Sequence, residues 1–443
     1  MTASARAIVL HVERKGRHAA AAAERDAHSR LAEAAGLARA IDLEIVDELI
    51  APLAVVKPAT LIGSGKVAEI AERVEETAAG LVVVNAQLTP IQQRNLEKAW
   101  SAKVLDRTGL ILEIFGRRAA TREGTLQVEL AHLQYQKSRL VRSWTHLERQ
   151  RGGFGFLGGP GESQLEADRR LIEERITKIE KQLASVVRTR ALHRKGRARV
   201  PYPVIAFVGY TNAGKSTLFN RLSGASVLAQ DLLFATLDPT MREIVLPHGR
   251  KVILSDTVGF ISDLPTSLIA AFRTTLEEVL EADLILHVRD VSHAETEAQA
   301  ADVNRVLDEL GIDEVRRGQI IEVWNKLDLL QPEARMAREA KASRKEDAVL
   351  ISAITGEGVD SLLQAIEERL DTGETAYEIF VEAADGEGQA WLHDRGEVLE
   401  SRLFSDGRIK LVVRLSKDKA GQASARFGRM MRLPAKDHKA AAE

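Results

Sequence analysis

The chain of 443 residues contains no cysteine. Structural disulfides, thiolate metal sites and cysteine nucleophiles are therefore excluded, and a cytoplasmic location is expected. The sequence also lacks any apolar run near the ~18 residues that a membrane-spanning helix needs. The apolar run at 7–12 is too short for a secretory core and is predicted to be a first strand. A hydrophobic content of 45% allows sizeable cores, and the length predicts about three domains.

A glycine-rich loop lies between a predicted strand at 204–208 and a predicted helix that begins near Thr217. In such a loop, glycines let backbone N–H groups turn toward phosphates. Lys215 adds charge near the β- and γ-phosphates, and the Ser216 hydroxyl can ligate Mg²⁺. The predicted nucleotide-binding residues of this loop are Gly209, Tyr210, Thr211, Asn212, Ala213, Gly214, Lys215, Ser216 and Thr217.

The ends of three further predicted strands carry residues that select the nucleotide. After the strand at 251–255, Asp256 can hold the water shell of the metal, and the amide of Gly259 can reach the γ-phosphate. After the strand at 320–324, Asp328 can accept two hydrogen bonds from guanine that adenine cannot offer. After the strand at 348–351, a backbone amide can meet the guanine oxygen. The predicted contacts are Asp256, Thr257, Val258, Gly259, Phe260, Asn325, Lys326, Asp328, Ser352 and Ala353.

Each of these short motifs alone occurs by chance in ordinary turns. Four of them in this order, each at a strand end, leave little room for that interpretation, because ligands of open parallel sheets bind at the carboxyl ends of the strands. The set resembles the translation-factor class of GTPases over about 201–371.

The segment between the glycine loop and Asp256 is predicted to act as a switch. Thr236 can close over the γ-phosphate and complete the Mg²⁺ coordination, with Ser216 as a direct ligand and Asp256 acting through water; Thr240 is the alternative. The predicted nucleotide contacts of this segment are Phe234, Ala235, Thr236, Leu237 and Asp238.

Phe260 stands where many GTPases have a glutamine that orients the attacking water. A phenyl ring cannot make this hydrogen bond, so the catalytic residue is unknown and intrinsic hydrolysis is expected to be slow. A partner, a cation or a rearranged loop would supply the missing group. Asn212 occupies a loop position found in K⁺-using GTPases, so K⁺ is a second candidate cofactor beside Mg²⁺.

The first segment, 1–110, alternates predicted strands and helices, which indicates a small parallel α/β domain. The predicted strands are 7–12, 43–47, 81–85 and 103–106, and the predicted helices are 24–39, 66–78 and 91–100. The glycine turn at 63–66 could hold a second phosphate, but it lacks the full loop spacing, which favours a structural turn.

The second segment, 111–200, contains two heptad stripes, which predict an antiparallel helical hairpin. The first stripe is Leu126, Leu130, Leu133, Lys137, Leu140, Trp144 and Leu147. The second is Leu165, Arg169, Ile172, Ile176, Ile179, Leu183 and Val186. The alternative interpretation is two ordinary amphipathic helices that face a core; it differs from the hairpin only in what the two stripes pack against.

The glycine-rich stretch at 151–162, between the two stripes, could be a flexible linker. Its aromatic residues instead suit stacking on unpaired bases. Residues 101–200 hold 21 lysines and arginines against 11 aspartates and glutamates, about +10 in net charge, whereas the whole chain carries −2. RNA binding is therefore predicted. The candidate RNA contacts are Arg149, Arg151, Phe154, Phe156, Arg194, Lys195 and Arg197.

The expected architecture is α/β, in four parts: an N-terminal α/β domain (1–110), the hairpin (111–200), a P-loop GTPase domain (201–372) and a small C-terminal α+β domain (373–443). In the last part, β-like runs occur at 377–382 and 409–414, a short helix is possible near Trp391, and the final residues 436–443 look frayed.

Assembled, these motifs resemble the HflX-type GTPases over nearly the whole chain. The stretches that carry the resemblance are 62–66, 92–97, 106–108, 111–115, 127–131, 159–166, 209–217, 234–238 and 256–260. The resemblance implies a cytoplasmic GTPase, expected to be a monomer, that binds the large ribosomal subunit. It implies an N-terminal part that reaches toward the peptidyl-transferase region and can split stalled or idle ribosomes.

Three functions remain open from the sequence. The first is a GTP-hydrolysing switch on the ribosome. The second is an RNA-remodelling protein that uses ATP at 63–66. The third is a scaffold that uses GTP only for stability.

Overall fold

The computed structural model describes residues 5–14, 26–150, 160–197, 202–224, 233–234, 236–237, 239–263, 273–345, 347–370, 375–415 and 417–433. By its contacts the chain divides into two compact units, and each is described by itself. One unit comprises 1–187, 204–244 and 253–362, and the other comprises 188–203, 245–252 and 363–443.

The first unit begins with a four-stranded parallel sheet in the order β2-β1-β3-β4. Its strands are β1 (Arg6–Arg14), β2 (Glu44–Leu53), β3 (Leu81–Asn85) and β4 (Lys103–Asp106). Its helices are α1 (Ala27–Arg39), α2 (Ser64–Thr77), α3 (Pro90–Trp100) and α4 (Arg107–Arg118). The predicted strand–helix alternation is confirmed, and α4 is an addition to it.

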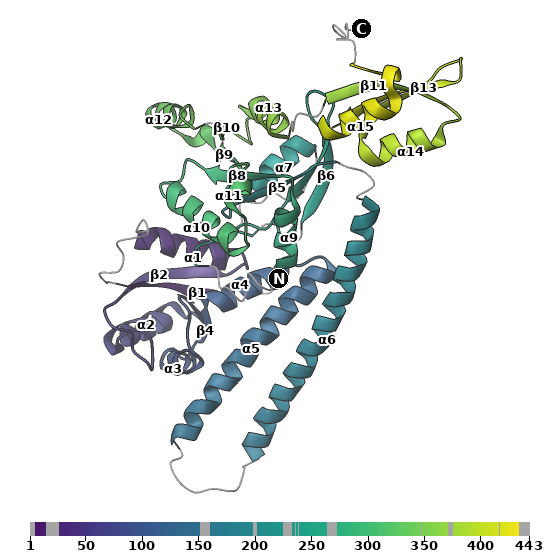
Figure 1. Cartoon of the computed structure of the whole chain (residues 1–443). Coiled ribbons are helices and arrows are strands. Elements are labelled where there is room, and N and C mark those ends of the chain that lie inside the picture. Colours follow the sequence, from purple (N-terminus) through teal and green to yellow (C-terminus); the bar gives the residue numbers. More distant parts are fainter. Residues whose placement is uncertain are drawn as a thin grey trace. The chain divides into compact units, whose positions relative to one another are not determined.

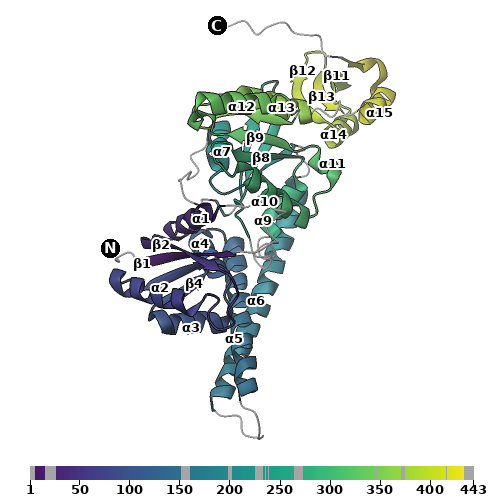
Figure 2. The ribbon, with the colours of Figure 1, turned by 90° about the vertical axis from the view of Figure 1, so that its left-hand side faces the viewer.

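The two central strands, β1 and β3, are buried on both faces over 7–12 and 82–84, which fits their apolar runs, whereas the edge strand β2 is mostly exposed or half-buried. Val9 and Val83 contribute to one core with α1 and α4, and Ile8 and Val82 contribute to another with α2 and α3. Figure 2 shows α1 and α4 on one side of the sheet and α2 and α3 on the other.

Two long helices follow, α5 (Arg122–Gln150) and α6 (Pro160–Arg197), and they run alongside each other (Figure 1). On α6 the predicted stripe is buried at Ile176 and Ile179. Ion pairs join the helices, from Arg175 to Glu129 at 2.6 Å and from Lys137 to Glu173 at 3.2 Å. The predicted pair of helices is confirmed; its tip, 151–159, lies outside the described residues.

A six-stranded sheet in the order β10-β9-β8-β5-β7-β6 follows. Its strands are β5 (Val204–Gly209), β6 (Thr240–Val245), β7 (Lys251–Asp256), β8 (Leu284–Asp290), β9 (Ile321–Asn325) and β10 (Ala348–Leu350). Its helices are α7 (Lys215–Ser223), α9 (Arg273–Glu281), α10 (Thr296–Glu309), α11 (Glu314–Arg317), the 3₁₀ helix η1 (Leu327–Leu329), α12 (Pro332–Ala342) and α13 (Val359–Leu370). The strands predicted here from apolar runs are confirmed.

The second unit contains an antiparallel sheet in the order β12-β13-β11-β14. Its elements are β11 (Thr375–Glu382), α14 (Gly386–Arg395), β12 (Glu397–Leu403), β13 (Arg408–Leu415), α15 (Lys417–Phe427), the 3₁₀ helix η2 (Gly428–Met430) and β14 (Met431–Arg432). Ile379, Leu392 and Val413 form its core. The two predicted strands and the short helix are confirmed, whereas 436–443 lie outside the described residues.

Across the part of the chain that the structure describes, no helix is both long enough and apolar enough to cross a bilayer.

Candidate nucleotide-binding site

The loops that follow β5, β7, β9 and β10 lie at the carboxyl ends of neighbouring strands of the six-stranded sheet. In the sheet, β5 lies between β7 and β8. The chain places β6 and β7 on one side of β5 and then crosses to β8 on the other, so the strand order reverses beside β5. Open α/β sheets bind ligands at such a reversal.

The glycine loop after β5 has a backbone that side chains would obstruct. At Gly214 (φ 92°) an added Cβ would lie 2.2 Å from Nδ2 of Asn325, and at Gly209 (φ 154°) it would lie 2.2 Å from the carbonyl oxygen of Val288. Helix α7 begins at Lys215, so its free N–H groups point into the loop. This arrangement suits an anion.

Lys215 is buried beneath the loop, and its Nζ donates to the carbonyl oxygens of Gly209 at 3.1 Å and Tyr210 at 2.9 Å. Burial lowers the pKa of this amine to about 8, against the opposing charge of Asp256. A phosphate beside Nζ would favour the charged form.

Three oxygen donors converge next to the loop. The hydroxyls of Ser216 and Thr236 donate to Oδ2 of Asp256 at 2.7 and 2.9 Å and lie 2.9 Å from each other. Burial raises the pKa of Asp256, and these hydrogen bonds and the charge of Lys215 oppose the rise. The other carboxylate oxygen, Oδ1, is buried and has no hydrogen-bond partner among the described residues. Hard oxygens with an unpaired carboxylate atom fit Mg²⁺.

The segment after Asp256 is joined to the glycine loop through its backbone. Phe260 donates its N–H to the carbonyl of Gly209 at 3.0 Å, and Thr211 donates to the carbonyl of Phe260 at 2.7 Å. A Cβ on Gly259 would lie 3.0 Å from Cα of Thr211 and 3.0 Å from Nζ of Lys215, so a side chain there would crowd the glycine loop. Gly259 thus lies beside the amine expected to contact phosphate.

The residues predicted to contact guanine also converge. Asn325 accepts a hydrogen bond from the N–H of Ala353 at 2.9 Å and donates to the carbonyl of Ala213 at 2.9 Å. Ser352 donates to Asp328 at 2.5 Å. Asn325 thus ties the base-binding loop to the glycine loop, and Asp328 keeps one oxygen free of that bond.

Asp290, at the end of β8, was not found from the sequence. Its Oδ2 pairs with Nζ of Lys326 at 2.8 Å, and its Oδ1 accepts from the backbone and hydroxyl of Ser292. Lys326 has a left-handed backbone, with φ of 69°. A short polar motif after a strand was the only available signal.

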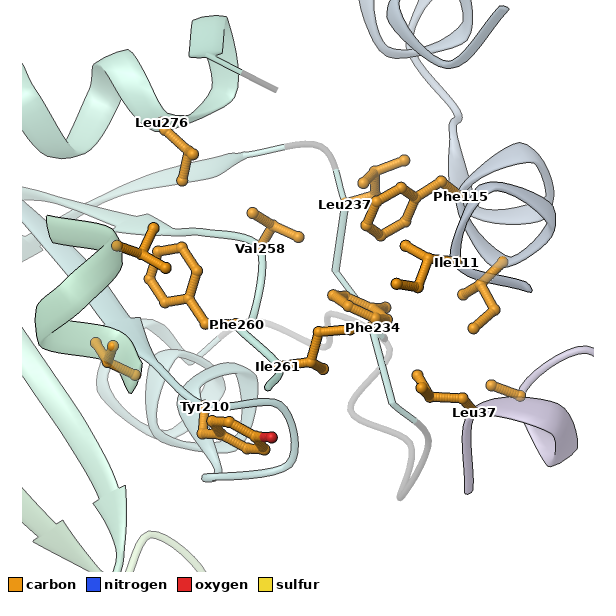
Figure 3. Close-up of a cluster of buried hydrophobic side chains, with 14 of the residues drawn as sticks. Leu37, Ile111, Phe115, Tyr210, Phe234, Leu237, Val258, Phe260, Ile261 and Leu276 are labelled. Atoms are coloured by element: carbon orange, nitrogen blue, oxygen red, sulfur yellow. The ribbon is translucent and has the colours of Figure 1, made fainter. Parts of the chain in front are cut away.

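Phe260 lies in an apolar environment. It is 1% exposed and belongs to an apolar cluster with Leu276 and Val258. Figure 3 shows its ring turned away from Phe234 and Ile261, which lie on the side of Ile111. The interpretation that this ring orients no water is consistent with its burial.

Phe234 joins the predicted switch to the N-terminal helices. Its ring is 2% exposed and meets Phe115 of α4 edge-on, with centroids 4.8 Å apart. Leu37 of α1 and Ile111 of α4 belong to the same cluster (Figure 3). The sequence offered no sign of this contact.

A buried polar network makes a second connection. Glu33 of α1 accepts hydrogen bonds from Arg107 at 2.6 Å, from Ser262 Oγ at 2.7 Å and from the Tyr210 hydroxyl. Arg107 also donates to the Ser262 carbonyl at 2.6 Å, and the Ser262 N–H donates to the Tyr210 hydroxyl at 2.6 Å. Burial opposes ionisation of Glu33, but Arg107 and the other donors outweigh it and hold the pKa of the carboxyl below its usual range.

Not every predicted residue can be placed. Ala235 and Asp238 lie outside the described residues, as do the candidate RNA contacts Arg151, Phe154 and Phe156. The remaining RNA candidates lie on the long helices: Arg149 on α5, and Arg194, Lys195 and Arg197 on α6.

The turn at 63–66 is the start of α2. Gly63 caps the helix in an extended conformation, and Lys66 pairs with Glu69 at 2.6 Å. A Cβ would meet nothing within 4 Å at Gly63 or Gly65, so neither glycine is required by a close approach.

Four family models match the chain in succession. They are described as GTP-binding GTPase N-terminal (28–116), GTP-binding GTPase Middle Region (118–197), 50S ribosome-binding GTPase (204–326) and HflX C-terminal domain (337–438). The GTPase HflX of Magnetococcus marinus is 53% identical over 383 residues, which cover 86% of this chain and 87% of the relative. The chain belongs to the HflX family of GTPases. The GTPase HflX of Escherichia coli is 44% identical over 81% of this chain and 83% of its own length.

Membership of the HflX family confirms the resemblance and the P-loop GTPase fold expected from the motifs, and it establishes GTP hydrolysis as the reaction. Solved structures are more distant. A GTP-binding protein from Sulfolobus solfataricus in complex with GDP is 23% identical, with a TM-score of 0.44, over 82% of this chain and 98% of that one. The complex of SsGBP with GDP is 24% identical, with a TM-score of 0.47, over the same shares.

Proposed function

We propose that this GTPase binds the large ribosomal subunit as a GTP-dependent switch and splits or rescues stalled or idle 70S ribosomes. The family model described as 50S ribosome-binding GTPase supports the partner. The observation that carries the switch is that both loops next to the triphosphate site contact the N-terminal helices, through Phe234 and through Ser262. A change at the γ-phosphate would therefore be transmitted to the N-terminal part.

The chain's own groups have separable roles in GTP hydrolysis. Lys215 and the amides at the start of α7 hold the phosphates, and the Gly259 amide reports the γ-phosphate. Ser216 and Thr236 would hold Mg²⁺ through hydroxyls, and Asp256 would do so through water. When bound, Mg²⁺ offsets the charge that develops on the phosphate oxygens. Asn325, Asp328 and the Ala353 amide orient guanine.

Slow intrinsic turnover is expected from the buried Phe260, because its phenyl ring can neither donate nor accept the hydrogen bond that would orient water. Contact with the ribosome would then supply or arrange the missing group, as trans-acting groups do for other GTPases. K⁺ at Asn212 remains the alternative source, and a monomeric state remains a prediction.

The four-part division at 110, 200 and 372 is also proposed. Each of the three sheets would form its own part, and α5 with α6 would be the RNA-binding part, supported by about +10 net charge over 101–200.

The deciding experiment measures GTP turnover of the full chain with and without purified large subunits. A large stimulation is expected, together with a drop in light scattering when 70S ribosomes are mixed with the protein and a non-hydrolysable GTP analogue. A Lys215→Ala chain, which removes the phosphate contact, serves as the control and should do neither. A turnover rate that is indifferent to large subunits would refute the ribosome switch.

A further inference from the structure

Phe234 has an unusual backbone and an unusual environment. Its φ is +56°, a conformation that bulky residues rarely adopt and keep only when surrounding packing holds them there. Its ring is almost completely buried, although it belongs to a loop. It belongs to one buried cluster with Leu37 of α1 and Phe115 of α4, and Ile261 of the loop after β7 lies beside it (Figure 3).

Neighbouring contacts reinforce this placement. Leu233 lies so close to α1 that a Cβ on Gly36 would be 3.1 Å from its Cδ1. Leu237, on the other side, is buried in the same cluster as Phe115 and Ile111. Three apolar side chains of one short segment are therefore anchored on helices that precede them by more than 100 residues in the sequence.

Thr236 lies between Phe234 and Leu237 in the sequence, but its contacts are polar. Its hydroxyl donates to Asp256 at 2.9 Å and lies 2.9 Å from Ser216 Oγ, at the group of oxygens that fits Mg²⁺. The packing of Phe234 thus coincides with a Thr236 that is already in reach of the metal donors.

We propose that Phe234 is a positioning residue for Thr236: its ring, seated on Phe115, holds the switch loop so that the Thr236 hydroxyl is ready for Mg²⁺ before nucleotide arrives. The N-terminal part thereby completes the GTPase site in cis. This inference rests on the metal-binding role proposed for Thr236.

Without the Phe234 ring, the switch loop can leave the position in which the Thr236 hydroxyl reaches Asp256. If the Thr236-in state falls from dominant to about a tenth of the molecules, the apparent affinity for the Mg²⁺ complex of a GTP analogue falls about tenfold. The affinity for GDP without Mg²⁺ depends on the glycine loop and the guanine contacts, and it should not change.

The test uses the full chain with Phe234→Ala. A second variant, Phe115→Ala, removes the other ring of the same contact. Two readouts are taken: amide hydrogen exchange of peptides across 233–241 without nucleotide or metal, and the Mg²⁺ dependence of fluorescent GTP-analogue binding. Faster exchange and about tenfold weaker Mg²⁺-dependent binding are expected for both variants. The double variant should be no worse than either single one, because both remove the same contact.

Phe404→Ala, a truncation of a half-exposed ring on the second unit, is the matched control and should change neither readout. Metal-free GDP affinity and the thermal midpoint report folding of every variant. Additive effects in the double variant, or unchanged Mg²⁺ dependence in a folded Phe234→Ala chain, would overturn the inference.

Thr236→Ala separates this inference from the proposal beneath it. If Thr236→Ala weakens Mg²⁺-dependent binding while Phe234→Ala does not, only the positioning role fails. If Thr236→Ala itself has no effect, the metal-binding role assigned to Thr236 fails.

Discussion

Asp328 shows how much chemistry one carboxylate can decide. Ser352 donates to its Oδ1, which orients the group, and the carboxylate can then accept from both nitrogen donors of guanine. Asp328 is exposed in this structure, so a base without that donor pair loses the two charge-assisted hydrogen bonds, which are worth about 1.5–3 kcal/mol each.

Asp328→Asn converts an acceptor pair into one acceptor and one donor. The variant should lose about 10- to 100-fold in GTP affinity. It should gain affinity for xanthosine triphosphate, whose second carbonyl accepts the new donor. Competition between the two nucleotides for a fluorescent analogue measures both changes.

The control is Asp360→Asn, which removes the charge of an exposed carboxylate on α13 and should not change the preference for GTP over xanthosine triphosphate. An Asp328→Asn chain that still prefers guanine as strongly as the parent would remove Asp328 from the site.

Asp290 illustrates a residue whose contact is visible only in the tertiary structure. It holds the amine of Lys326, a residue of the guanine motif, but it comes from β8, one strand away from that motif. Many strands end in an aspartate, so the residue type alone carries no prediction.

At the scale of elements, α1 and α4 are tied to the loop after β7 by the Glu33 network. Glu33 faces Arg107, Tyr210 and Ser262 directly, and His11, Arg30 and Asp263 lie around the same group. Such a fully hydrogen-bonded buried carboxylate is costly to leave without its partners.

The lowered pKa of Glu33 predicts a pH dependence of stability. A carboxyl whose folded pKa lies below its unfolded value of about 4.3 contributes stability above that pH, and the contribution is lost as pH falls through the folded pKa. Urea unfolding of the parent and of Glu33→Gln should therefore differ most above about pH 5, and the difference should shrink as pH falls below the unfolded value.

His11 changes stability in an overlapping window, because burial lowers its pKa to about 4 from the usual 6.5. The charge of Glu33 raises the pKa of His11, so both chains also carry His11→Gln, and the difference between them then isolates Glu33. Parallel pH profiles for the two chains would show that Glu33 is not ionised in this network.

For the whole molecule, charge is distributed unevenly. The chain carries −2 in total, whereas residues 101–200 carry about +10. Overall charge therefore says little about partners, and the basic part can bind a polyanion while the rest stays neutral or acidic.

If α6 contacts RNA phosphates, binding to large subunits should weaken with salt. Neutralising Arg194, Lys195 and Arg197 together to glutamine should lower the slope of log affinity against log salt by up to about 3. Sedimentation of the protein with large subunits across a salt series measures this slope. Arg194→Lys with Arg197→Lys keeps the charge and should keep the slope, and an unchanged slope in the triple variant would exclude these residues.

Much of this protein could be predicted from local sequence. The four nucleotide motifs are short, and each depends on a backbone turn or a side chain within a few positions, as at Gly214 and Asp328. The strand at 81–85 was predicted because a strand buried on both faces is continuously apolar. Helix α4 was missed because its buried run begins directly at the end of β4, without an intervening turn.

What the sequence by itself determined is the GTPase family, and it predicted the phosphate loop and the metal donors, since their chemistry is carried by residue type and close spacing. Only the tertiary structure decided that Glu33 meets Ser262, 229 positions away, and that Phe234 rests on Phe115. The hydrophobic periodicity of the sequence does not predict such contacts, because each depends on how separate sheets and helices pack. That packing connects the switch loops to the N-terminal helices.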